Sequence, residues 1–178
     1  RGELRDYLGM VSTGEVSIAV KPQYIDKLPR IFDGEVRELL ARVDDRGEME
    51  NYTQLMGITH ILDRKLGDLS GGELQRVAIC ATLLKEADVY FFDEPSSYLD
   101  IYERMRMVGV VRGLAEKGKR VLVVEHDLAI LDVLCDLIHV IYGERSAYGI
   151  FTPPRSTRTA INAYLDGFLP EENVRIRD

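Results

Sequence analysis

Residues 69–76 read Leu-Ser-Gly-Gly-Glu-Leu-Gln-Arg, and this stretch decides the fold of the chain. Ser70 is a typical helix N-cap, and Glu73 follows it at the spacing of a capping box. The apolar residues that follow recur on one helical face up to about Lys85. The stretch therefore predicts a helix over residues 70–85 whose first turn contains two adjacent glycines.

The first turn of this helix has two interpretations. Its free backbone N–H groups and the positive end of the helix dipole form a cradle for an anion, and glycines let the backbone approach a phosphate closely. In the alternative, Ser70 simply caps the helix. Because a capping box does not require two adjacent glycines, Gly71 and Gly72 favour phosphate binding.

Two acids follow an apolar run further along the chain. Residues 89–92 read Val-Tyr-Phe-Phe, which is typical of a strand in a parallel sheet covered on both faces, and Asp93 and Glu94 come directly after them. Ligands bind at the carboxyl ends of strands in open α/β sheets. One carboxylate there can hold Mg²⁺, and the next can polarise an attacking water. The alternative is a turn with two solvated acids, but acids that end an apolar strand carry a desolvation cost.

Another apolar run, residues 121–124, predicts a second buried strand, and His126 follows it after Glu125. A histidine at a strand end could contact a terminal phosphate or the water that attacks it. In the alternative, His126 is a structural residue that a neighbouring acid satisfies. Asp127 is expected to cap the next helix.

Strands and helices alternate along the rest of the chain, which predicts an α/β fold with mainly parallel strands. The expected strands cover residues 17–21, 89–92, 121–124 and 137–142, and residues 148–151 are expected to pair with the last of these through the turn 143–146. The expected helices cover residues 3–10, 34–43, 48–56, a short segment from residue 58, 70–85, 100–116, 128–134 and 156–165. Residues 168–178 are expected to form an extended, charged tail.

The composition limits the classes of protein to which the chain can belong. The 178 residues are 46% hydrophobic and 30% charged, which is ordinary for a soluble globular domain, and no apolar run has the ~20 residues of a membrane span. The net charge is −7, whereas a protein that coats nucleic acid is usually basic. Any contact with RNA is therefore expected from a local patch, such as Arg155, Arg158, Arg175 and Arg177.

The two cysteines, Cys80 and Cys135, lie in apolar helical patterns. This placement predicts buried, reduced thiols rather than a disulfide or a metal pair. Reduced thiols are consistent with a cytoplasmic protein.

In this order and at these distances the motifs resemble those of the ABC ATPase superfamily. The matching motifs are the signature Leu69–Gln75, the Walker B segment Val89–Glu94, the D-loop Ser96–Asp100, the H-switch His126 and the Q-loop Gln23. More closely, the chain resembles the RNase L inhibitor family, the ribosome-recycling ABC ATPases of subfamily E, at residues 21–26, 93–100, 124–128, 142–143, 146–149, 162, 165–167 and 172–178. The resemblance covers essentially the whole chain and points to the first of that family's two nucleotide-binding domains.

The resemblance implies a fold and a set of cofactors. The fold would be part of an ABC-type nucleotide-binding domain, with a mainly parallel sheet flanked by helices and a helical lobe that carries the signature. ATP and Mg²⁺ would bind to it, whereas iron–sulfur clusters would belong to an N-terminal domain outside this chain. We expect four segments, namely residues 1–30 with a helix-loop-helix remnant and the Q-loop, 31–85 as the helical lobe, 86–152 as the α/β core, and 153–178 as the C-terminal helix and hinge tail.

The resemblance also implies roles for individual residues. Asp93 and Gln23 would lie at the magnesium ion, Glu94 would be the catalytic carboxylate, and His126 would hold the γ-phosphate and water. The residues that would face the ATP bound by an opposite domain are Ser70, Gly71, Gly72 and Gln75. Asp100 would communicate between the two sites.

The function that the resemblance implies is ATP-driven splitting of ribosomal subunits in the cytoplasm, without a membrane. The partners would be the second nucleotide-binding domain of the same protein, the small ribosomal subunit and a release-factor-like protein. The alternatives are an ABC domain of a transporter, a DNA-repair ATPase, and a non-catalytic fragment that binds the ribosome or a partner.

One segment has the glycine spacing of a phosphate-binding loop but lacks its other residues. Gly9 and Gly14 have the GxxxxG spacing of a phosphate-binding loop, but Glu15 and Val16 follow in place of Lys and Ser or Thr. We therefore expect no Walker A loop in these residues, no ATP hydrolysis by the chain alone, and a chain that is a fragment of a longer protein. A missing phosphate-loop strand is expected to leave apolar edges on strands 89–92 and 121–124.

Overall fold

The computed structural model describes residues 13–144 and 147–176 and divides the chain into two compact units, Arg1–Glu125 and His126–Asp178. The expected helix over residues 3–10 and Gly9 of the GxxxxG spacing lie outside the described residues.

A three-stranded parallel sheet organises the first unit. Its order is β1 (Ile18–Lys21), β2 (Val89–Asp93) and β3 (Arg120–Val124), so β2 is central. Lys21 lies opposite Phe92, and Asp93 lies opposite Val124. Because the strands are parallel, the residues that follow β1 and β2 emerge at the same edge of the sheet.

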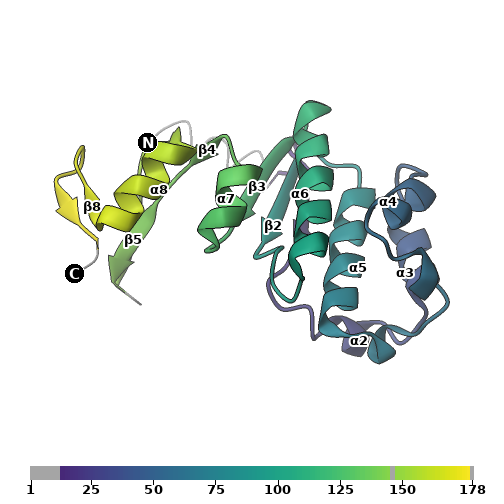
Figure 1. The fold of residues 1–178 in the computed structure, drawn as a ribbon. Helices are drawn as coiled ribbons and strands as arrows, with labels where there is room; N and C mark the ends of the chain where they lie inside the picture. Colours follow the sequence, from purple (N-terminus) through teal and green to yellow (C-terminus); the bar gives the residue numbers. More distant parts are fainter. Residues whose placement is uncertain (1–12, 145–146, 177–178) are drawn as a thin grey trace. The chain divides into compact units, whose positions relative to one another are not determined.

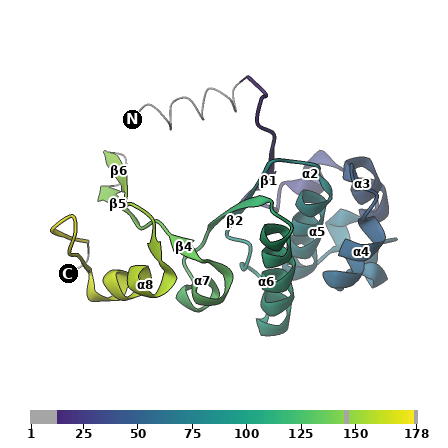
Figure 2. The ribbon, with the colours of Figure 1, turned by 90° about the horizontal axis from the view of Figure 1, so that it is seen from above.

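Two long helices cover one face of this sheet. Helices α5 (Gly71–Leu84) and α6 (Ile101–Glu116) lie side by side on it in both views (Figures 1 and 2). The core between helices and sheet contains wholly buried side chains, among them Ile79, Leu83, Tyr90, Phe92 and Met107.

The other face of the sheet corrects an expectation. Strand β3 was expected to be buried, but Leu122 is 53% exposed and alternates with half-buried neighbours. In β1, Val20 is also 53% exposed, and its neighbours Ala19 and Lys21 are buried. These side chains point away from α5 and α6. Such alternation is typical of a sheet with one covered face.

The expectation of exposed edges is wrong for residues 89–92 and agrees with the structure for residues 121–124. Strand β2 has a partner on each side. Among the described residues, β3 pairs with β2 alone, so its second edge has no partner strand.

A helical lobe precedes α5. It consists of α2 (Leu28–Ile31), α3 (Val36–Val43), α4 (Met49–Leu55), η1 (Thr59–Ile61) and η2 (Leu66–Asp68). Helices α3 and α4 pack on α5 (Figures 1 and 2). The sequence predicted α3 and α4 but missed the four-residue α2, which begins next to Pro29.

The described residues of the second unit, 126–144 and 147–176, form two helices and three small antiparallel sheets. Helix α7 (Leu128–Leu134) packs on α8 (Thr157–Asp166). The paired strands are β4 (Leu137–Ile138) with β7 (Arg155–Ser156), β5 (Ile141–Glu144) with β6 (Tyr148–Phe151), and β8 (Phe168–Leu169) with β9 (Val174–Arg175). The expected pairing with residues 148–151 is confirmed for residues 141 and 142, whereas Gly143 and Glu144, which were expected in the turn, belong to β5.

Two expectations fail in this unit. Residues 137–142 do not form one continuous strand, because Val140 N donates to Thr152 Oγ1 at 2.9 Å and Thr152 N donates to Val140 O at 3.0 Å. This link separates β4 from β5 and turns each toward an antiparallel partner. The expected extended tail instead contains the β8–β9 hairpin.

One residue of the expected RNA-binding patch, Arg155, is not exposed. The Arg155 side chain is buried and forms ion pairs with Glu171, at 3.3 Å, and with Glu172. Arg155 therefore stabilises contacts within the second unit and is not an exposed member of the expected patch. Cys80 is buried as expected, whereas Cys135 is half-buried at the end of α7, and neither of these two described cysteines forms a disulfide.

Candidate functional site

The turn after β2 brings the two predicted acids to the carboxyl edge of the sheet. Asp93 is the last residue of β2, and Glu94 follows in the left-handed region with φ +46°. Both residues are half-buried, and Pro95 and Ser96 behind them are buried. A non-glycine residue in this region is strained and persists only where its surroundings hold it.

A buried lysine holds this turn from β1. Lys21 Nζ donates to Asp93 O at 2.8 Å and to Glu94 O at 3.3 Å. Burial lowers the pKa of Lys21 to about 8, against the opposing effect of the Asp93, Glu125 and Glu94 charges. Sequence analysis missed this residue, although a lysine that ends the apolar run Ile18–Lys21 was a visible signal.

A buried glutamine holds the turn from the signature helix. Gln75 Nε2 donates to Glu94 O at 2.9 Å and to Pro95 O at 3.0 Å, and the residue has 0% exposure. The sequence led us to expect Gln75 to face a nucleotide on an opposite domain. Its burial favours a positioning role over that direct contact.

Polar contacts from β3 and from the turn itself complete the arrangement. Glu94 N donates to Val124 O at 2.9 Å, and Ser96 N donates to Glu125 Oε1 at 2.9 Å. Ser97 Oγ donates to the Glu94 carboxylate at 3.3 Å. The backbone of the turn is therefore fixed by β1, β3 and α5.

The N-terminus of α5 is capped as predicted. Glu73 N donates to Ser70 Oγ at 3.3 Å, and Ser70 N donates to Glu73 Oε2 at 2.8 Å, which together form a capping box. Arg64 pairs with Glu73 at 2.9 Å. Gly71 is exposed and Gly72 is half-buried, so backbone of this first turn is accessible.

The D-loop packs directly against the signature. Tyr98, with φ +64°, lies over Gly71, and a Cβ added to Gly72 would lie 3.0 Å from Tyr98 O. Arg76 on α5 pairs with Glu103 on α6 at 2.9 Å, and Asp100 caps α6 by accepting from Glu103 N at 2.9 Å. Signature and D-loop therefore form one packed group.

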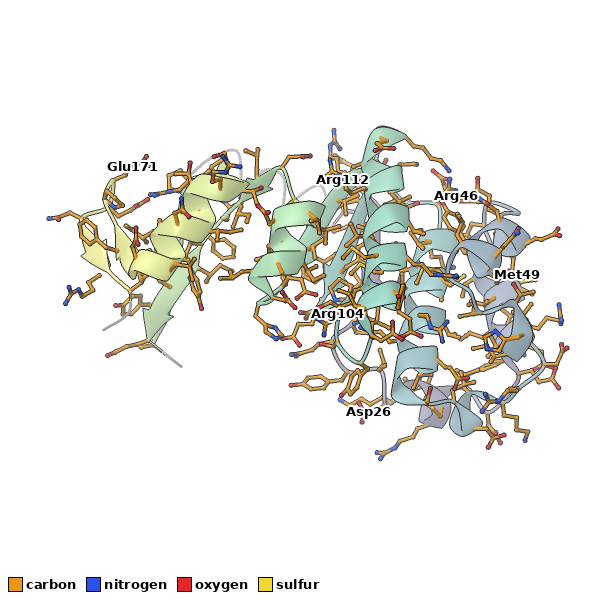
Figure 3. All side chains as sticks on the ribbon, in the orientation of Figure 1. Asp26, Arg46, Met49, Arg104, Arg112 and Glu171 are labelled. Carbon is orange, nitrogen blue, oxygen red and sulfur yellow. The ribbon has the colours of Figure 1, made fainter. Side chains whose placement is uncertain are left out.

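Asp100 thus has a structural role as a helix cap beside the signature. The same end of α6 is tied down by Arg104 Nε, which donates to Leu99 O at 2.9 Å. Figure 3 shows Arg104 toward this end of α6 and Arg112 further along the helix.

The remaining predicted residues lie at strand ends. Gln23 is half-buried in the loop after β1, next to the strand that carries the two acids. His126 is exposed and is the first residue of the second unit. Asp127 caps α7 as predicted, accepting from Ala129 N at 3.0 Å. The structure brings Asp93 and Glu94 together with Gln75, and Gly71 and Gly72 together with the D-loop.

The residues present fit a magnesium ion. Mg²⁺ is usually held by one or two carboxylates and keeps several waters. Asp93 supplies a half-buried carboxylate, and Gln23, half-buried at the neighbouring strand end, could add an amide oxygen. The accessible first turn of α5 fits a phosphate.

The capping box predicts a pH effect on stability. The Ser70 N–H, the Ser70 hydroxyl and Arg64 lower the pKa of Glu73 below its ordinary value of 4.5. Because the folded pKa is the lower one, this stabilisation is present above pH 4.5 and is lost as the pH falls through the folded pKa. We expect Glu73→Gln to lower the free energy of unfolding by about 0.3–1 kcal/mol at neutral pH, and by less in acid.

Urea denaturation of the wild-type protein and the variant at both pH values measures this difference. Glu15→Gln, at an exposed position in the turn before β1, is the control and should leave stability unchanged. A gap between wild type and Glu73→Gln that stays the same in acid would contradict the prediction.

No helix among residues 13–144 and 147–176 is long and apolar enough to cross a membrane.

Comparison with known proteins identifies the family to which the chain is related. The family model described as "ABC transporter" matches residues 8–97. The chain is 48% identical over 175 residues to an uncharacterized ABC transporter ATP-binding protein of Methanocaldococcus jannaschii, covering 98% of the chain and 28% of the relative. It is 42% identical over 180 residues to translation initiation factor RLI1 of Saccharomyces cerevisiae, covering 98% of the chain and 30% of the relative.

Solved structures agree. The chain matches a structure described as RNase-L Inhibitor with a TM-score of 0.95 and 52% identity, over 99% of the chain and 35% of that structure. It matches archaeal ribosome recycling factor aABCE1, in complex with the archaeal ribosomal stalk protein aP1, with a TM-score of 0.94 and 52% identity, over 98% of the chain and 34% of that structure.

The chain spans about 30% of the length of the curated relatives named here. The expected ABC-type α/β fold is confirmed by the family model and by the solved structures. The chain therefore belongs to the ABC transporter family, and within that family its relatives are RNase L inhibitor and ABCE1 proteins.

Proposed function

We propose that this chain is part of an ATP-binding and ATP-hydrolysing ABC-type domain that drives the splitting of ribosomal subunits in translation. The observation that carries the proposal is the turn Asp93–Pro95, which is fixed at the carboxyl edge of the sheet by Lys21 and by Gln75 from the signature helix. Strained, tightly held acids at a sheet edge are typical of catalytic sites.

Each site residue has a role in this proposal. Asp93 and Gln23 hold Mg²⁺, which when bound supplies positive charge to the phosphates. The Glu94 carboxylate orients the attacking water and accepts its proton, and His126 holds the γ-phosphate and the water. Ser70, Gly71 and Gly72 receive the phosphates of ATP bound by a second nucleotide-binding domain, and Asp100 communicates between the two sites.

The partners follow from the names of the relatives. One solved relative is described in complex with a ribosomal stalk protein, and another is a ribosome-bound model with Pelota. We propose the same kinds of partner for the intact protein, namely the small ribosomal subunit, the stalk and a release-factor-like protein. Iron–sulfur clusters would belong to another domain of that protein, and a translation factor of this kind would act in the cytoplasm.

Sucrose-gradient analysis tests the proposal. The intact gene product, expressed from its complete reading frame, is mixed with assembled ribosomes and ATP, a non-hydrolysable ATP analogue or ADP. We expect free subunits to accumulate with ATP or the analogue and not with ADP. Magnesium-dependent hydrolysis without any change in the ribosome profile would instead indicate an ABC ATPase of another system. Ribosome co-sedimentation without nucleotide binding would indicate a non-catalytic binding module.

A further inference from the structure

We propose that Gln75 is a positioning residue that holds the backbone of Glu94 in its working conformation and so links the signature helix to the catalytic turn. This inference rests on the proposed function of Glu94. It assigns to Gln75 a partner within its own domain, in place of a nucleotide on an opposite one.

The hydrogen bonds of Gln75 define the link. Its amide nitrogen donates to two consecutive carbonyls, Glu94 O at 2.9 Å and Pro95 O at 3.0 Å. The residue belongs to α5, whereas the carbonyls belong to the turn after β2, and its 0% exposure protects both bonds from competition with water.

The conformation of Glu94 requires such a link. Its φ of +46° is left-handed, and a non-glycine residue there is strained. Lys21 holds the same carbonyl from β1, and Val124 O accepts from the amide of Glu94. Through Gln75, α5 also takes part in holding this backbone.

The side-chain carbonyl oxygen of Gln75 indicates that stability alone does not account for a glutamine at this position. Gln75 Oε1 is buried and has no hydrogen-bond partner among the described residues. A buried, unsatisfied acceptor destabilises the folded state, and an apolar side chain of similar size would avoid that cost. The two donated hydrogen bonds to the turn are what a leucine or methionine could not supply.

The position of Gln75 on α5 connects the first turn of this helix to the backbone of Glu94. Gly71 and Gly72 lie one helical turn before Gln75, at i−4 and i−3. Phosphate binding at the first turn of α5 would shift that turn. The Gln75 side chain would then transmit the shift to the Glu94 carbonyl. The signature and the domain's own catalytic turn are joined without passing through the D-loop.

Steady-state ATPase kinetics of the intact gene product tests the inference. Gln75→Leu removes both amide donors at similar volume, and we expect kcat to fall about 10–100-fold while KM for ATP changes less than about 3-fold. Gln75→Met, which fills the same space with a more flexible chain, should show the same split and serves if Gln75→Leu does not fold.

Thr82→Val is the matched control. It keeps the shape of another buried side chain on α5 and removes one hydrogen bond, from Thr82 Oγ1 to Ala78 O at 3.0 Å, away from the turn. Thermal unfolding compares the stability of the variants, and Thr82→Val should retain wild-type kcat even where its unfolding temperature falls as much as that of Gln75→Leu.

Three results would overturn the inference. A kcat within 2-fold of wild type in a folded Gln75 variant would show that the link is not used, and an equal loss of kcat in Thr82→Val would show a general effect of destabilising α5. A raised KM with unchanged kcat would show direct nucleotide contact. Failure of the proposed function is distinguishable, because wild type itself would then show no hydrolysis that Glu94→Gln abolishes.

Discussion

Replacing Glu94 by glutamine in the intact gene product is expected to lower kcat for ATP hydrolysis by about 10²-fold or more while ATP binding is retained. Glutamine keeps the shape and hydrogen-bonding reach of the side chain but cannot accept a proton from the attacking water, and a positioned general base contributes about 10²–10⁴-fold. The backbone of the turn is held by Lys21 and Gln75 through carbonyl oxygens, so the substitution leaves these contacts in place.

Phosphate release and equilibrium binding of a fluorescent ATP analogue measure the two quantities separately. Glu86→Gln is the control, because Glu86 is an exposed glutamate that pairs with Lys119 outside the site, and it should hydrolyse ATP at the wild-type rate. Hydrolysis by Glu94→Gln at more than a third of the wild-type rate would exclude Glu94 as the catalytic base.

Replacing Gly72 by valine is expected to lower hydrolysis by at least about 10-fold. A Cβ at this position would lie 3.0 Å from Tyr98 O and 3.4 Å from Glu103 Oε2, so the D-loop must move away from α5. That movement is resisted, because Arg76 holds Glu103 and Arg104 holds Leu99 O. The branched side chain would also stand in the first turn of α5, where a phosphate needs close access to the backbone.

Hydrolysis rate and unfolding temperature, measured on the same preparation, separate the loss of the site from the loss of the fold. Overpacking of this kind destabilises proteins by about 1–3 kcal/mol, which leaves most of a stable domain folded. Gly109→Ala on α6 is the control, since a Cβ there meets nothing within 4 Å, and it should keep wild-type activity. Wild-type hydrolysis by Gly72→Val would show that the contact between signature and D-loop is not needed.

Several parts of the fold follow from signals between residues close in sequence. The capping boxes at Ser70 and Asp100 each join residues three positions apart, and the apolar runs of β2 and β3 are read within five residues. The strained turn at Glu94 also lies where two acids follow a buried strand. Strand ends and helix starts could therefore be predicted, and with them most candidate site residues.

Other features depend on which segments meet. Residues 137–142 read as one apolar strand, and the link between Val140 and Thr152, twelve positions away, divides them. Arg155 reads as part of a basic tail, and its contact with Glu172 buries it. In each case a partner that no local pattern reveals decides the environment of the residue.

The sequence by itself determined the motifs, their order and the α/β class, because caps, periodicity and strand ends are set by neighbours along the chain. Only the tertiary structure decided what holds the catalytic turn. Lys21 and Asp93 are 72 positions apart, and Gln75 and Glu94 are 19 apart. Burial of a lysine or a glutamine becomes favourable only when folding supplies the carbonyl oxygens that replace water, and that pairing is a property of the packed sheet and helix.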